Sequence, residues 1–347
     1  MRDFDKNAYT VSPKRYFPGG NTARGFVNKF SGIVPPWCEN HYSYIIKGGP
    51  GVGKSTLMKQ IAKSAREMGY ITEEFHCSGD PESLDALRIP GKKVVLLDGT
   101  APHSIDPKVP GAGQEIVNLG CFKNKGELRR LHPDIEKLSA MNSRSYGIAY
   151  SYLAAAGELR KSATEAIRPL LRTKLVESCI ADFLGSEESP PCPAARRLFS
   201  SAITHRGVVD LSRSYPQEGL SIAIGWPAGG LFLEIAEKLC KNHRREVFHD
   251  PLLPEYSEKI HLPELKLSFI LTAEEDADLE TKEFLTGDIP GLVSFNMQEC
   301  DRLISKAVEQ LRICKELHDE LEGLYRKFVD FTEVDRLSNK LREEIFP

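Results

Sequence analysis

The pattern of apolar and polar positions in the first hundred residues predicts an α/β fold. Three short apolar stretches, at residues 42–46, 71–77 and 93–98, have the length and the polar flanks of buried strands. Between the first two, residues 56–68 carry apolar side chains at helical spacing. After the second strand, residues 80–83 begin with Asp-Pro, which is typical of a helix start.

Later in the chain the pattern becomes helical. A helix is expected around residues 128–138, a second run covers 150–183, and a third covers 303–324. Periodicity stops at the proline-rich residues 185–193. We therefore expect a first domain at 1–185, a linker at 186–195 and a second domain at 196–347.

A glycine-rich turn lies between the first strand and the first helix, and it matches the phosphate-binding pattern G-x-x-x-x-G-K-[ST]. Glycines let backbone N–H groups turn toward a phosphate, and the positive end of the following helix dipole points at the same anion. In this pattern the lysine reaches the β- and γ-phosphates, and the following hydroxyl binds Mg²⁺. The predicted nucleotide-binding residues are Gly48, Gly49, Pro50, Gly51, Val52, Gly53, Lys54, Ser55 and Thr56.

The strand at 93–98 ends in Asp98, which is where a second P-loop element is expected. A carboxylate at the end of a strand beside the loop strand reaches the magnesium shell, so Asp98 and Ser55 are the predicted metal ligands. The alternative is a core strand ending in an Asp-Gly turn. His103 follows at the same sheet edge, where it would polarise the γ-phosphate or a water, unless it is a loop histidine bonded to backbone.

Other polar residues carry weaker expectations. Glu115 is a candidate base, although ordinary solvation is the alternative. Three arginines could form a lid over phosphates or simply belong to a solvated face: Arg129, Arg130 and Arg144. Similarly, His318 and Glu322 share a helix face with Asp319 beside them, and we interpret these three as surface residues rather than as a metal site.

Composition limits the class of protein. The 347 residues are long enough for about two domains, and 41% hydrophobic with 27% charged residues is ordinary for a globular protein. A net charge of −3 does not favour nucleic acid, and no apolar run approaches the length of a membrane span. Eight cysteines without a C-x-x-C pair suggest reduced thiols in a cytoplasm.

The second half of the chain repeats the first. Residues 197–209 align with 15–27 at an offset of 182, and a later block aligns at an offset of 173. The second copy has residues 225–231 in place of the loop, without the lysine and hydroxyl, and Leu271 in place of the aspartate. We therefore expect an internal pseudo-dimer with one nucleotide per chain. The repeat retains Arg206, which either pairs with a carboxylate or reaches across to the phosphate.

These motifs resemble a family of uncharacterised prokaryotic ATPases that carry two tandem P-loop halves and are sometimes labelled nucleotide-kinase-like. The matching stretches are residues 19–25, 48–56, 76–81, 98–103 and 318–322. The resemblance implies two α/β domains with parallel sheets flanked by helices, each with a helical appendage, and ATP binding. Members tend to keep a usable loop in both halves, and this chain departs from that pattern.

The expected function is a Mg²⁺-dependent ATPase with one active site in the first half, in which Lys54, Asp98 and His103 carry the chemistry. A small-molecule kinase with an unknown second substrate is an alternative. A further alternative is an ATP-dependent switch or scaffold whose second half binds a protein partner. An N/T-K-x-D string is missing after the nucleotide strands, which disfavours guanine specificity.

Overall fold

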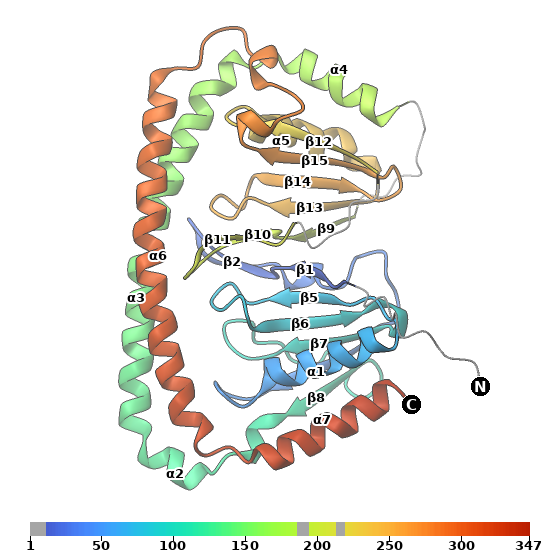
Figure 1. Ribbon diagram of the computed structural model, residues 1–347, viewed down its shortest axis with the longest axis vertical. Helices are drawn as coiled ribbons and strands as arrows, with labels where there is room; N and C mark the ends of the chain where they lie inside the picture. Colours follow the sequence, from blue (N-terminus) through green and yellow to red (C-terminus); the bar gives the residue numbers. More distant parts are fainter. Residues whose placement is uncertain (1–11, 186–193, 213–218) are drawn as a thin grey trace, which may run out of the picture.

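The computed structural model describes residues 12–185, 194–212 and 219–347. Within them the chain forms three β-sheets and seven α-helices, so the fold is mixed α/β as expected. Figure 1 shows two sheet regions stacked along the long axis of the molecule, with two long helices beside them. Most of the predicted linker at 186–195 lies outside the described residues.

The first sheet has the strand order β1–β5–β6–β7–β4–β8. Its strands are β1 (Lys14–Tyr16), β4 (Tyr42–Lys47), β5 (Glu73–His76), β6 (Leu84–Ile89), β7 (Val94–Asp98) and β8 (Gln114–Asn118). The strands expected at 42–46, 71–77 and 93–98 are therefore confirmed as β4, β5 and β7. Helix α1 (Lys54–Glu67) follows β4, which confirms the helix expected at 56–68, and its apolar face is buried.

Strand β6 corrects two expectations. It forms at residues 84–89, where a helix starting at Asp80 was expected, and it runs antiparallel to both neighbours, so the sheet is mixed and not parallel. The connection at 77–83 is too short for the crossover that parallel strands need. Asp80 instead holds a turn, because its carboxylate accepts hydrogen bonds from the N–H of Glu82 and the hydroxyl of Ser83.

The second sheet has the order β12–β15–β14–β13–β9, which repeats the first sheet from β4 to β1 but has no counterpart of β8 among the described residues. Its strands are β9 (Ala195–Leu198), β12 (Leu220–Gly225), β13 (Arg245–His249), β14 (Ser257–Leu262) and β15 (Leu267–Thr272), and helix α5 (Gly229–Leu239) follows β12. Each pair of neighbouring strands has the same relative direction as its counterpart in the first sheet. Both sheets also shift register at matching places, after Phe75 and after Phe248, and 248 − 75 = 173 is an offset found in the sequence.

A third sheet joins the two halves. Its order is β11–β10–β2–β3, with one hairpin from each half. The strands are β2 (Gly19–Thr22), β3 (Gly25–Asn28), β10 (Ser201–Thr204) and β11 (Gly207–Asp210). Asn21 pairs with Ile203 across the join, and its side-chain N–H donates to the Ile203 carbonyl at 2.9 Å. The two repeated segments thus form part of one continuous sheet.

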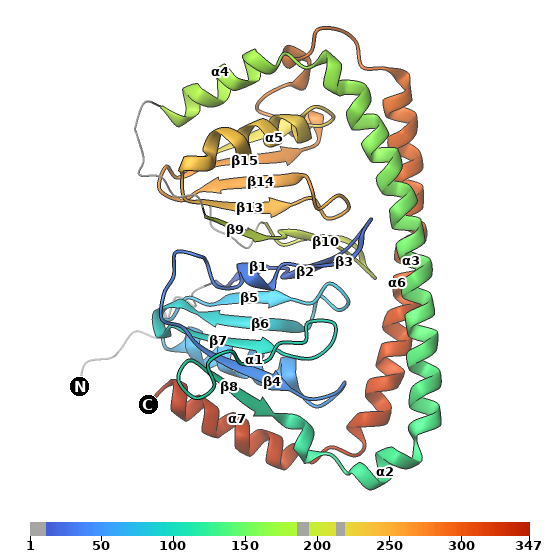
Figure 2. The same cartoon turned by 180° about the vertical axis from the view of Figure 1, so that it is seen from behind.

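Two long helices hold the halves together along one side. The helices outside the sheets are α2 (Lys125–Arg130), α3 (His132–Ile167), α4 (Thr173–Leu184), α6 (Gly291–Arg326) and α7 (Phe331–Ile345). Helices α3 and α6 lie side by side in both views and share an apolar cluster (Figures 1 and 2). The three expected stretches are helical, but two of them are broken. The stretch at 128–138 is divided at Leu131 between α2 and α3, and the run at 150–183 is broken at 168–170, where Pro169 lies.

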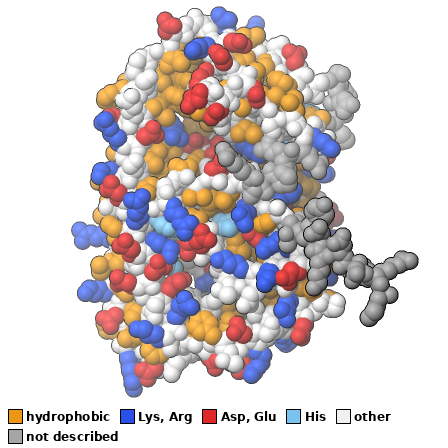
Figure 3. Space-filling model, viewed as in Figure 1, with side chains coloured by type: hydrophobic (Ala, Val, Ile, Leu, Met, Phe, Trp, Pro, Cys, Tyr) orange, Lys and Arg blue, Asp and Glu red, His pale blue; other side chains and the backbone are white. Residues whose placement is uncertain are grey.

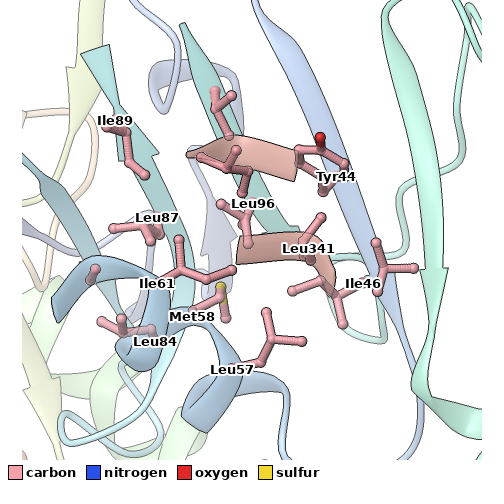
Figure 4. Packing of buried hydrophobic residues seen from close by; sticks show 14 of the residues in the cluster. Tyr44, Ile46, Leu57, Met58, Ile61, Leu84, Leu87, Ile89, Leu96 and Leu341 are labelled. Carbon is pink, nitrogen blue, oxygen red and sulfur yellow. The ribbon is translucent and has the colours of Figure 1, made fainter. Parts of the chain in front are cut away.

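The short helices α4 and α7 each pack on the sheet of the other half. From α7, Leu341 enters the core between α1 and the first sheet (Figure 4). From α4, Val176 and Ile180 enter the core of the second sheet. A division at 186–195 assigns α4 to the first half and α7 to the second, whereas in space the two halves exchange these helices.

Candidate functional site

The glycine turn lies between the end of β4 and the start of α1, at residues 48–53. Gly51 and Gly53 have φ values of +69° and +93°, in the left-handed region that favours glycine. A methyl group on Gly51 would also lie 2.8 Å from Cγ of Arg326 and 2.9 Å from the carbonyl oxygen of Glu322. The turn therefore needs glycine both for its backbone conformation and for its close approach to the end of α6.

Lys54 is the first residue of α1, and its ammonium group folds back over the turn. Its Nζ donates to the carbonyl oxygens of Gly48 and Gly49 at 3.1 and 3.0 Å. The same Nζ lies 3.6 Å from Oδ2 of Asp98, and both side chains are largely buried. The structure thus brings together the lysine and the carboxylate that the sequence singled out.

Asp98 reaches this position through the pairing of two neighbouring strands. It ends β7 and pairs with Ile46 near the end of β4, so its side chain emerges beside the turn. Its Oδ1 accepts hydrogen bonds from the backbone N–H and the hydroxyl of Thr100, at 2.9 and 2.5 Å. Ser55, the other predicted metal ligand, accepts the N–H of Leu84 at 2.9 Å.

His103 is placed away from solvent in an aromatic setting. It is buried, and its ring stacks on Phe30 with 4.2 Å between the ring centroids. Its Nε2 lies 3.3 Å from Oδ2 of Asp85, a buried carboxylate on β6. The side-chain contacts that the structure shows for His103 are therefore to Asp85 and aromatic rings.

The weaker candidates lie on the surface. Glu115 is exposed on β8 and accepts a hydrogen bond from the phenol of Tyr42 at 3.3 Å. Arg129 and Arg144 are exposed, and the exposed guanidinium of Arg130 binds Glu127, three residues earlier on α2. These contacts match the solvated roles that were left open as alternatives.

Lys123 is a residue that the sequence did not point to. A methyl group on Gly49 would lie 2.6 Å from Nζ of Lys123. This ammonium group also sits over the ring of Tyr325, 5.0 Å from its centroid. Burial lowers the pKa of Lys123, and the positive charge of Lys54 lowers it further. Two cationic side chains therefore lie at one glycine turn, although about 70 residues separate them in the sequence and they share no motif.

The end of α6 brings further polar groups to the same turn. The N–H of Gly51 donates to Oε1 of Glu322 at 3.3 Å. One ligand atom from each of His318, Asp319 and Glu322 lies within 4.8 Å of the others, but Asp319 is also paired with Lys315 at 2.5 Å. Glu322 was interpreted as a surface residue, and the structure places it against the predicted phosphate-binding loop.

The corresponding place in the second half has neither the lysine nor the aspartate of the first half, although a methyl group on Gly225 would lie 2.0 Å from Oε2 of Glu274. Strand β12 and helix α5 are joined by residues 226–228 alone, which is shorter than the turn at 48–53. Leu271 pairs with Ile224 in the way that Asp98 pairs with Ile46, which confirms the predicted exchange of aspartate for leucine at this position.

No helix in the described ranges is long and apolar enough to cross a bilayer. Figure 3 shows acidic and basic side chains interspersed over one face of the molecule. Comparisons with protein-family models, with curated proteins and with solved structures found no match.

Proposed function

We propose that the chain is a Mg²⁺-dependent ATP-binding protein that hydrolyses ATP at the glycine turn of its first half. The observation that carries this proposal is the convergence of Lys54, Lys123 and Asp98 on a turn that leads into the N-terminus of α1. Two ammonium groups at one place repel each other, and an anion between them would relieve that repulsion. The groups present therefore fit a polyphosphate.

Different residues of the site would bind the phosphates and the metal ion. The N–H groups of the turn and of the first turn of α1 supply hydrogen-bond donors to phosphate oxygens. Lys54 now donates to two carbonyl oxygens of the turn, and it would exchange them for phosphate oxygens with a short side-chain movement. Asp98 and the hydroxyl of Ser55 offer the hard oxygen ligands that Mg²⁺ prefers. Bound Mg²⁺ would neutralise charge on the phosphates.

One nucleotide per chain is part of the proposal. The second half keeps the strand order but has Leu271 and a shorter connection in place of the carboxylate and the turn. The resemblance to tandem P-loop ATPases belongs to the same proposal, with the second half as a copy that has lost nucleotide binding.

An ATP-dependent switch is a second candidate, because one observation favours it. Helix α6 touches the turn through Glu322 at one end and runs beside α3 along both halves of the molecule (Figure 1). A nucleotide that changed the contact at Gly51 would act on an element that reaches the second half. In this case hydrolysis would be slow until a protein partner is added.

The test is a calorimetric titration of the purified chain with a non-hydrolysable ATP analogue, with and without Mg²⁺. We expect a stoichiometry of one analogue per chain and tighter binding when Mg²⁺ is present. Phosphate release from ATP is then measured alone and with candidate acceptors. No binding at millimolar analogue, or two equivalent sites per chain, would contradict the proposal.

A further inference from the structure

Helices α3 and α6 occupy matching places in the two halves. The two helices have the same length. The C-terminal end of α6 lies at the loop between β4 and α1, and the C-terminal end of α3 lies at the loop between β12 and α5. Aligning their ends makes Glu322 the counterpart of Ala163 and Arg326 the counterpart of Ile167, because 322 − 163 and 326 − 167 are both 159. The two ends can therefore be compared position by position.

The two helix ends carry different kinds of side chain, and this difference matches the difference between the two loops. At the second loop, Ala163 and Ile167 are fully buried in an apolar cluster with Trp226, Ala228 and Leu231. At the first loop, the matching positions carry a carboxylate and a guanidinium. Alanine and isoleucine suffice for a helix end that only packs on a loop, so packing alone does not explain Glu322.

Three carboxylates of the first half are held by groups outside the glycine turn or by Lys54. Asp98 accepts two hydrogen bonds from Thr100 and faces Lys54. Asp85 faces His103, and Glu115 is exposed and bonded to a tyrosine. Glu322 differs from all three, because its Oε1 accepts a backbone N–H of the turn itself, with Nδ1 of His318 at 4.0 Å from the same oxygen.

We propose that Glu322, supplied by the second half, is the catalytic base of the site, and this inference rests on the ATPase function proposed above. When ATP binds, a phosphate oxygen accepts the hydrogen bond from the N–H of Gly51 in place of Glu322. The Glu322 carboxylate is then released and lies beside the terminal phosphate. There it accepts a hydrogen bond from the attacking water and then its proton.

The step balances without a further reactant. The water oxygen forms a bond to the γ-phosphorus, and the bond from that phosphorus to the β–γ bridging oxygen breaks. The bonding electron pair leaves with ADP, and the water proton passes to Oε1 of Glu322 and from there to solvent. The products are ADP, inorganic phosphate and a proton.

The experiment compares Glu322→Gln with wild type and with Glu320→Gln, a substitution at an exposed carboxylate on the same helix. Each protein is measured for binding of the ATP analogue by calorimetry, for phosphate release at saturating Mg²⁺-ATP, and for thermal unfolding. We expect Glu322→Gln to bind the analogue at least as tightly as wild type, because the competing carboxylate charge is gone. Its phosphate release should fall by about 10²-fold or more, while Glu320→Gln should match wild type.

Several outcomes would overturn the assignment. Phosphate release at the wild-type rate in Glu322→Gln would show that another group takes the proton. Loss of analogue binding together with turnover, at an unchanged unfolding temperature, would make Glu322 a binding residue. Wild-type protein that binds the analogue but releases no phosphate would remove the catalytic role and leave binding intact. Failure of the wild type to bind at all would instead overturn the proposed function, and the inference with it.

Discussion

Arg206 of the second half forms an ion pair with Glu82 of the first half, with 2.7 Å between Nη1 and Oε1. The repeated residue Arg24 makes the reciprocal contact, at 2.9 Å from Glu255. The glutamates also match, because 255 − 82 = 173 is the offset of that block. The hydrogen bond from Arg206 lowers the pKa of Glu82. Of the two roles considered for Arg206, the structure shows the pairing with a carboxylate.

Substituting Arg206 should therefore have a small effect. Both side chains of the pair are more than half exposed, so Arg206→Ala should lower the free energy of unfolding by less than about 1 kcal/mol. Phosphate release should stay within about twofold of wild type, since the guanidinium is held by Glu82. Chemical denaturation and a turnover assay on the same preparation would check this. A large loss of turnover at unchanged stability would mean that Arg206 leaves Glu82 for the phosphate.

Lys54→Ala should weaken ATP binding strongly. A hydrogen bond to a charged group contributes about 1.5–3 kcal/mol, which corresponds to roughly 10- to 100-fold in the dissociation constant. Lys59→Ala, an exposed lysine on the same helix, is the matched control and should bind like wild type. Calorimetry would measure both, and circular dichroism would confirm that the fold is kept. Wild-type affinity in Lys54→Ala would refute the proposed site.

Asp98→Asn should separate turnover from binding. The donors for phosphate are backbone N–H groups and Lys54, so analogue binding in the absence of metal should change by less than about fivefold. Mg²⁺-dependent phosphate release should drop by about 10²-fold, because an amide is a poorer Mg²⁺ ligand than a carboxylate. Asp106→Asn, a carboxylate with 82% of its side chain exposed, is the control. Equal metal dependence in Asp98→Asn and wild type would assign the metal to other groups.

Leu341→Ala tests the exchange of the terminal helices. Leu341 lies on α7, is 4% exposed, and packs in the core between α1 and the first sheet (Figure 4). Its truncation should lower the free energy of unfolding by about 2–4 kcal/mol, whereas Glu343→Ala on the exposed face of α7 should change it little. Urea unfolding would measure both. Equal stability of the two variants would show that α7 is not part of this core in solution.

The raised pKa of the Glu258 carboxyl predicts that the stability of the protein depends on pH. Burial of the Glu258 carboxyl raises its pKa to about 7, although the hydroxyls of Ser200 and Ser201 donate to it. The folded protein therefore keeps this proton to about pH 7, while the unfolded chain releases it near pH 4.5. Because the folded state binds more protons between these values, this group lowers stability as pH rises through that range.

Glu258→Gln removes this pH-dependent contribution to the free energy of unfolding. The difference in unfolding free energy between variant and wild type should grow in favour of the variant from pH 4.5 to 7.5, by on the order of 3 kcal/mol, and then level off. Glu320→Gln should show no such trend. Urea unfolding over this pH range is the measurement, and a difference that does not change with pH would show that Glu258 titrates normally.

The first strand, the glycine turn and helix α1 could be predicted from sequence because the interactions that form them are local. An apolar run, glycines with positive φ and helical periodicity lie within about 30 consecutive residues. The meeting of Lys54 with Asp98 could also be expected, since the carboxyl ends of neighbouring parallel strands meet at one sheet edge. The repeat was visible because two copies keep matching residues at fixed offsets.

Other features were decided by contacts between distant residues. The Asp-Pro pair at residue 80 has the local signal of a helix start, but pairing with strands on both sides makes the following residues strand β6. The exchange of α4 and α7 depends on which sheet the apolar face of each helix covers. Lys123 and Glu322 reach the turn from other elements of the chain. The sequence by itself thus determined the loop and its helix. Only the tertiary structure decided which charged residues from distant parts of the chain surround them. The reason is that a charged side chain has no periodic pattern in the sequence that indicates its partner.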